Sequence, residues 1–152
     1  MGPFARSIAG KVWNAPNTAL GLAYGLTGHL VGEIAGKNPQ ISLGRNAIEF
    51  RNNPLTPFGA LTLGNAIIYR DDPYNMSDDF WCGEVPRGQD NLPEKHEDAH
   101  TRQGEVLGPL YFPSNLFGGL AGLLLDRRWH GDHNWNEAGP KSTPPRPWPS
   151  RK

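Results

Sequence analysis

The chain contains a single cysteine, Cys82, among its 152 residues. One thiol cannot form an intramolecular disulfide, so the fold does not require an oxidising compartment. The first residues also lack the continuous apolar stretch and the cleavage site of a secretory signal. We therefore expect the protein either to stay in the cytoplasm or to be exported by a non-classical route.

The chain also lacks an excess of charge of either sign. Fifteen Lys and Arg residues balance fifteen Asp and Glu residues, and no basic run occurs before the short C-terminal segment. A surface that binds nucleic acid needs clustered positive charge. The composition therefore predicts that nucleic acid is not a partner.

Long apolar runs are interrupted. Within residues 18–36, His29 and Glu33 fall inside the run, and glycines recur at three- and four-residue spacing. Small residues at this spacing let another backbone approach a helix closely. We predict a buried or closely packed helix here rather than a membrane span.

A second uncharged run, residues 107–125, is broken by Pro113. Its longest continuous apolar part is too short to cross a membrane. We predict a buried core helix that is capped by Ser114 or Asn115 and ends near Asp126. Contact with a membrane stays open for this run but is not favoured.

Glycine and proline are abundant, with 19 and 15 residues respectively, and five tryptophans indicate a packed core. The length suits one domain better than two. We predict a single domain over residues 1–140 with an irregular lead-in at residues 1–17. A proline-rich extended tail is expected over residues 141–152.

An internal repeat predicts β-strands. The segment S-L-G-R-N-A-I-E-F-R at residues 42–51 resembles T-L-G-N-A-I-I-Y-R at residues 62–70. β-branched and aromatic residues dominate both copies. We predict an α+β fold with a few helices and a small antiparallel sheet, followed by a turn-rich loop at residues 71–90. One strand could bind an extended peptide along its free edge, or the strands could only pack against the helices.

The strongest signal is the sequence H-E-D-A-H at residues 96–100. On a helix, residues four apart lie one above the other, so His96 and His100 would present two imidazoles to one ion. Glu97 projects from the neighbouring flank, where it could take a proton from a metal-bound water. This is the HExxH pattern of zinc-dependent peptidases.

The flanking residues predict that this motif is helical. Asn91 is a good N-cap, and Pro93 suits the first helical turn. Leu107 is followed by Gly108 and Pro109, which form a normal stop signal. A helix of about fifteen residues is expected.

A catalytic zinc site needs three protein ligands and one open position. Residues 129–139 are dense in side chains that can bind metal. Glu137 is the first choice, because a glutamate from a second helix after HExxH is the gluzincin arrangement. His133 is the next candidate, followed by His130 and Asp132.

Residues 96–113, H-E-D-A-H-T-R-Q-G-E-V-L-G-P-L-Y-F-P, resemble the HExxHxxQxxxLGPLY/F signature of small, largely uncharacterised bacterial HExxH proteins. The similarity extends to P-N-T-A-L-G-L-A-Y-G and L-T-L-G-N-A-I-I-Y and covers most of residues 14–140. In that group an N-x-x-E element commonly follows the apolar helix, and residues 134–137 match it. The alanine-rich continuation is replaced here by Gly139-Pro140. The resemblance implies a zincin-like metallopeptidase fold.

Together these features predict a zinc-dependent hydrolase that acts on a peptide or protein, with Glu97 as the general base. His130 or Tyr111 would polarise the substrate carbonyl or steady the oxyanion. Two alternatives stay open. One is a non-catalytic, zinc-stabilised module that is membrane-associated or toxin-linked. The other is a metal-free interaction protein whose proline-rich tail recruits partners.

Overall fold

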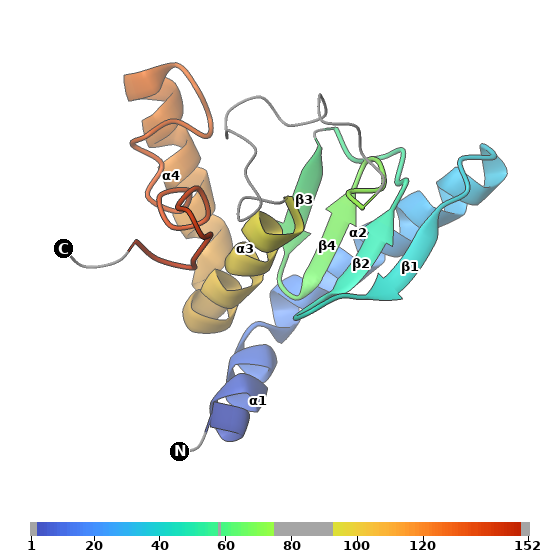
Figure 1. Ribbon diagram of the computed structural model, residues 1–152, viewed down its shortest axis with the longest axis horizontal. Helices are drawn as coiled ribbons and strands as arrows, with labels where there is room; N and C mark the ends of the chain where they lie inside the picture. The colour runs from blue at the N-terminus through green and yellow to red at the C-terminus, as the bar shows by residue number, and fades with distance from the viewer. Residues whose placement is uncertain (1–2, 58, 75–92, 150–152) are drawn as a thin grey trace.

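The computed structural model describes residues 3–57, 59–74 and 93–149, and these residues form a mixed fold of helices and one four-stranded sheet (Figure 1). The predicted cap at Asn91 and most of the predicted loop at residues 71–90, including Cys82, lie outside the described residues. The elements, in chain order, are α1 (Pro3–Trp13), α2 (Ala15–Ile34), β1 (Gln40–Leu43), β2 (Ile48–Arg51), β3 (Ala60–Leu63), β4 (Ala66–Tyr69), α3 (Pro93–Leu107), the 3-10 helix η1 (Gly108–Leu110) and α4 (Tyr111–Asp126).

The sheet lies between two helices. Figure 1 shows α2 behind the sheet and α3 in front of it. On the α2 side, the buried residues Phe50, Ala66 and Ile68 pack together with Leu22 and Tyr24 of α2. A second buried cluster forms on the opposite face, which is the side of α3. That cluster consists of Ala47, Ile67 and Tyr69.

The sheet is mixed, with the strand order β1-β2-β4-β3. The outer pairs β1–β2 and β3–β4 are antiparallel, whereas the central pair β2–β4 is parallel. The prediction of an antiparallel sheet is therefore wrong for the central pair. The reason is that each copy of the internal repeat forms a β-hairpin, and the second strands of the two hairpins, β2 and β4, pair with each other.

The glycines of α2 explain how closely it approaches the sheet. The buried residues of this helix include Gly21, Gly25, Gly28 and Gly32. A Cβ atom at Gly28 would lie only 1.9 Å from Oδ1 of the buried Asn53. The predicted close packing is thus confirmed for this face, although the helix begins earlier than predicted, at Ala15.

Two other predictions about helices are wrong. The expected irregular lead-in contains α1, so residues 3–13 are helical. The apolar helix α4 begins at Tyr111 and not at Ser114 or Asn115, because η1 carries the end of α3 almost directly into its first turn. No side-chain cap is needed where one helix continues into the next.

The helix α4 is also not the buried core helix that its leucines predict. Its buried positions after the first residue are Gly118, Gly119 and Gly122, while Leu124 is 81% exposed. The glycines allow the segment after α4 to fold back against the helix, which leaves much of the apolar surface uncovered. Among the described helices, none has the length and apolar character that a membrane crossing requires.

Candidate metal centre

The helix α3 presents the two motif histidines on one buried face. It spans 15 residues from Pro93 to Leu107, which is the predicted length. His96 and His100 are both buried, and their Nε2 atoms lie 3.1 Å apart. The i, i+4 spacing therefore brings two ring nitrogens to a single point in space.

Glu137 reaches the same point from the segment after α4. One of its carboxylate oxygens, Oε2, lies 3.4 Å from His96 Nε2, and the other, Oε1, lies 3.4 Å from His100 Nε2. The three side chains form the group of described residues that could hold a metal ion. The structure thus places Glu137, the first choice for the third ligand, next to both motif histidines.

The expectation that a second helix supplies Glu137 is wrong. The segment is a series of turns, in which the Glu137 N–H donates to the Asn134 carbonyl at 2.9 Å. Asn134 and Asn136 are fully buried, and Asn136 Nδ2 donates to the Ser114 carbonyl of α4 at 2.8 Å. Asparagine side chains that bond to backbone favour turns over helix, and Pro140 lacks the N–H that a helix would need.

The donor atoms lie close enough together to bind one metal ion. Zinc bonds to nitrogen and oxygen are about 2.0–2.2 Å long, so neighbouring ligand atoms in a tetrahedron lie roughly 3.3 Å apart. The nitrogen–nitrogen distance of 3.1 Å is close to this value, and each of the two nitrogens lies 3.4 Å from a different oxygen of Glu137. Oε2 of Glu137 is buried and accepts no hydrogen bond in the described part of the chain. A cation would satisfy that oxygen.

The electrostatics of the cluster also favour a cation. Burial works against a charged ring at His100, but the Glu137 carboxylate outweighs it and raises the pKa of His100 to about 9. Burial likewise works against a charged Glu137, yet His100 and His96 hold the pKa of its carboxyl well below the usual value. In the absence of a metal the cluster is therefore an ion-pair network, and a metal ion would take the place of the proton.

Glu97 lies beside this cluster at a cleft of about 310 Å³. Its side chain is buried, and its Oε2 accepts a hydrogen bond of 2.5 Å from the Thr62 hydroxyl of β3. Glu97 does not belong to the three-residue metal group. This arrangement leaves Glu97 available to exchange protons with a molecule in the cleft.

Of the other predicted residues, the structure brings two to the cleft. Tyr111 is buried and lines the cleft, and burial together with Glu97 raises the pKa of its hydroxyl. His130 also lines the cleft, with Nε2 3.8 Å from Glu137 Oε1, and its side chain is 46% exposed. Both are placed to contact a bound molecule.

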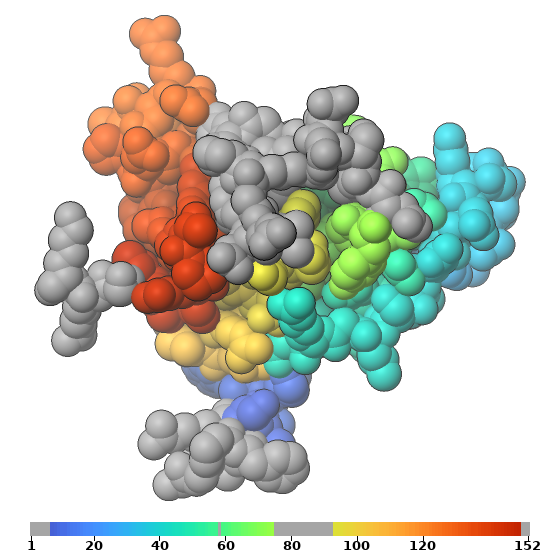
Figure 2. Space-filling view, in the orientation of Figure 1, coloured from blue at the N-terminus to red at the C-terminus, as the bar shows by residue number. Residues whose placement is uncertain are grey.

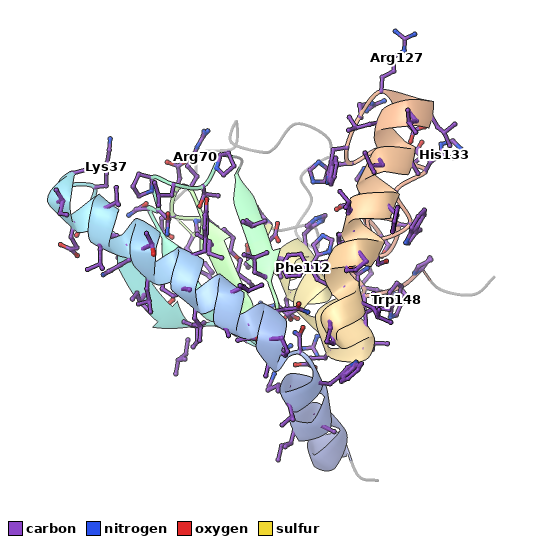
Figure 3. The ribbon with its side chains drawn as sticks, turned by 180° about the vertical axis from the view of Figure 1, so that it is seen from behind. Lys37, Arg70, Phe112, Arg127, His133 and Trp148 are labelled. Atoms are coloured by element: carbon purple, nitrogen blue, oxygen red, sulfur yellow. The ribbon has the colours of Figure 1, made fainter. Side chains whose placement is uncertain are left out.

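The other two candidates do not reach the cluster. His133 pairs instead with Asp126 at 2.7 Å, and Figure 3 shows it on the side of α4 away from the sheet. Asp132 is exposed and is not a member of the metal group. Neither residue is therefore brought into the candidate site.

Two side chains to which the sequence assigned no role contact the site. Thr62 has no local signal, because the β3–α3 contact joins residues 35 positions apart in the chain. Gln103 follows His100 by three residues, so it shares a helix face with that histidine, and it is fully buried. Its position on the helix face that carries the two motif histidines is the signal that could have identified it.

Comparison of the chain with protein-family models, with curated proteins and with solved structures found no match.

Proposed function

We propose that the protein is a zinc-dependent peptidase with a minimal zincin-like fold. The observation that carries the proposal is the convergence of His96, His100 and Glu137 on one point, with Glu97 alongside them at a cleft. The resemblance of residues 96–113 to bacterial HExxH proteins supports the same class. His96, His100 and Glu137 would hold the ion.

A zinc ion held there would supply a Lewis acid that polarises the scissile carbonyl and acidifies a water molecule. Glu97 accepts the proton from that water and returns it to the leaving amine. The Thr62 hydroxyl donates a hydrogen bond to one oxygen of Glu97, so the other oxygen is the one that accepts the proton. Tyr111 and His130 face the cleft, where they can donate hydrogen bonds to the oxyanion.

An extended peptide is the substrate that the cleft fits best. The strand β3 lies at the edge of the described sheet, and all four of its residues line the cleft. A free strand edge pairs with an extended main chain through backbone hydrogen bonds. The opposite wall is apolar, formed in part by Phe112 and Leu116 of α4, and Figure 3 shows Phe112 between α4 and the sheet. Apolar peptide side chains would pack there.

Removal of the metal tests this proposal. The full chain, purified with zinc, should cleave a reduced and carboxymethylated protein, with fragments read by mass spectrometry. Treatment with 1,10-phenanthroline should abolish cleavage, since Glu97 alone cannot acidify the water sufficiently. Zinc should restore cleavage, and magnesium should not, because the two-imidazole donor set suits zinc. Cleavage that persists without metal would refute the proposal.

The hydrogen bond from Thr62 to Glu97 gives a second prediction. Thr62→Val has a similar shape but no hydroxyl, so one oxygen of the buried Glu97 carboxylate loses its donor. A hydrogen bond to a charged group contributes about 1.5–3 kcal/mol, so kcat should fall roughly 10- to 100-fold. Zinc content should stay unchanged.

The matched control for this prediction is Thr62→Ser, which keeps the hydroxyl and should retain most of the activity. Initial rates on a fluorogenic peptide, together with zinc content by elemental analysis, provide the comparison. Equal rates for Thr62→Val and Thr62→Ser would show that the hydroxyl plays no part in orienting Glu97.

A further inference from the structure

We infer that Gln103 is a positioning residue that fixes the orientation of the His100 ring and joins two later segments of the chain to α3. The inference rests on the proposed metal site and deepens it. Gln103 is fully buried, and its Oε1 lies 2.9 Å from His100 Nδ1. Its Nε2 donates to the carbonyl of Asn136 at 2.8 Å and to the carbonyl of Pro147 at 2.6 Å.

The neighbours of Gln103 determine which way its amide group points. Two backbone carbonyls stand on one side, and because carbonyls only accept hydrogen bonds, the amide NH₂ must face them. The amide oxygen is then left to face His100 Nδ1. An amide oxygen also only accepts, so Nδ1 of His100 must carry a hydrogen. The neutral ring then has its lone pair on Nε2, which faces His96 and Glu137, where a metal ligand needs it.

The same amide joins three parts of the chain. The carbonyl of Asn136 directly precedes Glu137, so its bond to Gln103 sets the approach of the third ligand. The carbonyl of Pro147 belongs to the C-terminal segment, which closes on itself where the Arg146 N–H donates to the Gly139 carbonyl at 3.1 Å. Figure 2 shows this segment, in red, beside α4 in orange. The described part of the predicted tail therefore contacts the metal centre through Gln103.

The variant Gln103→Met tests this role, because methionine has a similar length but neither donates nor accepts a strong hydrogen bond. Loss of an outer hydrogen-bond partner of a metal ligand typically costs about 10- to 100-fold in metal affinity, so the zinc dissociation constant should rise by that factor. Competition with a chelating dye measures it. Arg102→Gln, an exposed neighbour on α3, is the matched control and should change the constant less than twofold.

A second measurement in the wild-type protein does not depend on whether the variant folds. Nitrogen-15 NMR of labelled histidine distinguishes a hydrogen on Nδ1 from one on Nε2. In the zinc-loaded protein, His100 should carry its hydrogen on Nδ1 and bind the ion through Nε2.

The outcomes separate this inference from the proposed function. Zinc affinity within twofold of wild type for Gln103→Met, or an Nε2–H tautomer of His100 in the zinc-loaded wild type, would overturn the positioning role. A wild-type protein that binds zinc and shows the Nδ1–H tautomer, but cleaves no peptide, would leave the role of Gln103 standing and remove only the peptidase activity.

Discussion

Glu97→Gln should lower kcat by about 10²- to 10⁴-fold and leave zinc bound, because general acid–base catalysis contributes an effect of that size. The carboxamide has the same shape as the carboxylate, and its oxygen can still accept the hydrogen bond from Thr62. What it cannot do is accept a proton from water. Since Glu97 lies outside the three-residue metal group, the zinc content of the variant should equal that of wild type.

The matched control is Asp98→Asn, which removes the neighbouring carboxylate on α3. Asp98, whose side chain is 16% exposed, pairs with Arg102 at 3.0 Å and does not belong to the metal group. Its amide variant should keep wild-type turnover. Single-turnover hydrolysis of a fluorogenic peptide measures both variants. Wild-type turnover in Glu97→Gln would exclude Glu97 as the base, and loss of zinc from it would identify Glu97 as a ligand.

The elements that the sequence predicts well are those fixed by neighbouring residues. The length of α3 follows from Pro93 in its first turn and Gly108 after its last residue. The convergence of His96 and His100 then follows from the helical repeat. The glycine spacing of α2 likewise predicts its close approach to the sheet, because both the spacing and the helix are local properties.

The elements that the sequence does not predict depend on contacts between distant segments. The parallel pairing of β2 with β4 joins two hairpins that are each locally complete, and nothing within one hairpin specifies the direction of the other. The contact of Thr62 with Glu97 is of the same kind. Glu137 lies in a series of turns that depends on the hydrogen bond from Asn136 to α4. The pattern N-x-x-E alone does not reveal that bond.

The exposed leucines of α4 show a different limit. An apolar run predicts burial, but the side of α4 that packs against the chain is the glycine side, at Gly118 and Gly122. Glycine gives little hydrophobic signal, although it lets the next segment approach the helix closely. The apolar pattern therefore identifies the helix correctly, but its prediction of a buried core helix is wrong.

Glu137→Gln should remove zinc binding, with a loss of affinity larger than the roughly 100-fold upper value for an outer-shell partner. The variant loses a carboxylate ligand whose negative charge offsets part of the charge of the cation. At a zinc concentration of 100 times the dissociation constant, binding stabilises the wild-type protein by about 2.7 kcal/mol. For a domain of this size that raises Tm by roughly 5–11 °C. Glu137→Gln should show no zinc-dependent rise in Tm.

His133→Asn is the informative control, because His133 was a candidate ligand that the structure pairs with Asp126 instead. Its zinc-dependent rise in Tm should equal that of wild type. The opposite pattern, with zinc lost from His133→Asn and kept by Glu137→Gln, would show that the ligand set is wrong. A wild-type protein whose Tm does not respond to zinc would show that the His96, His100 and Glu137 cluster is an ion-pair network. In that case Glu137→Gln would still lower the free energy of unfolding, because the buried His100 ring would lose the carboxylate that raises its pKa.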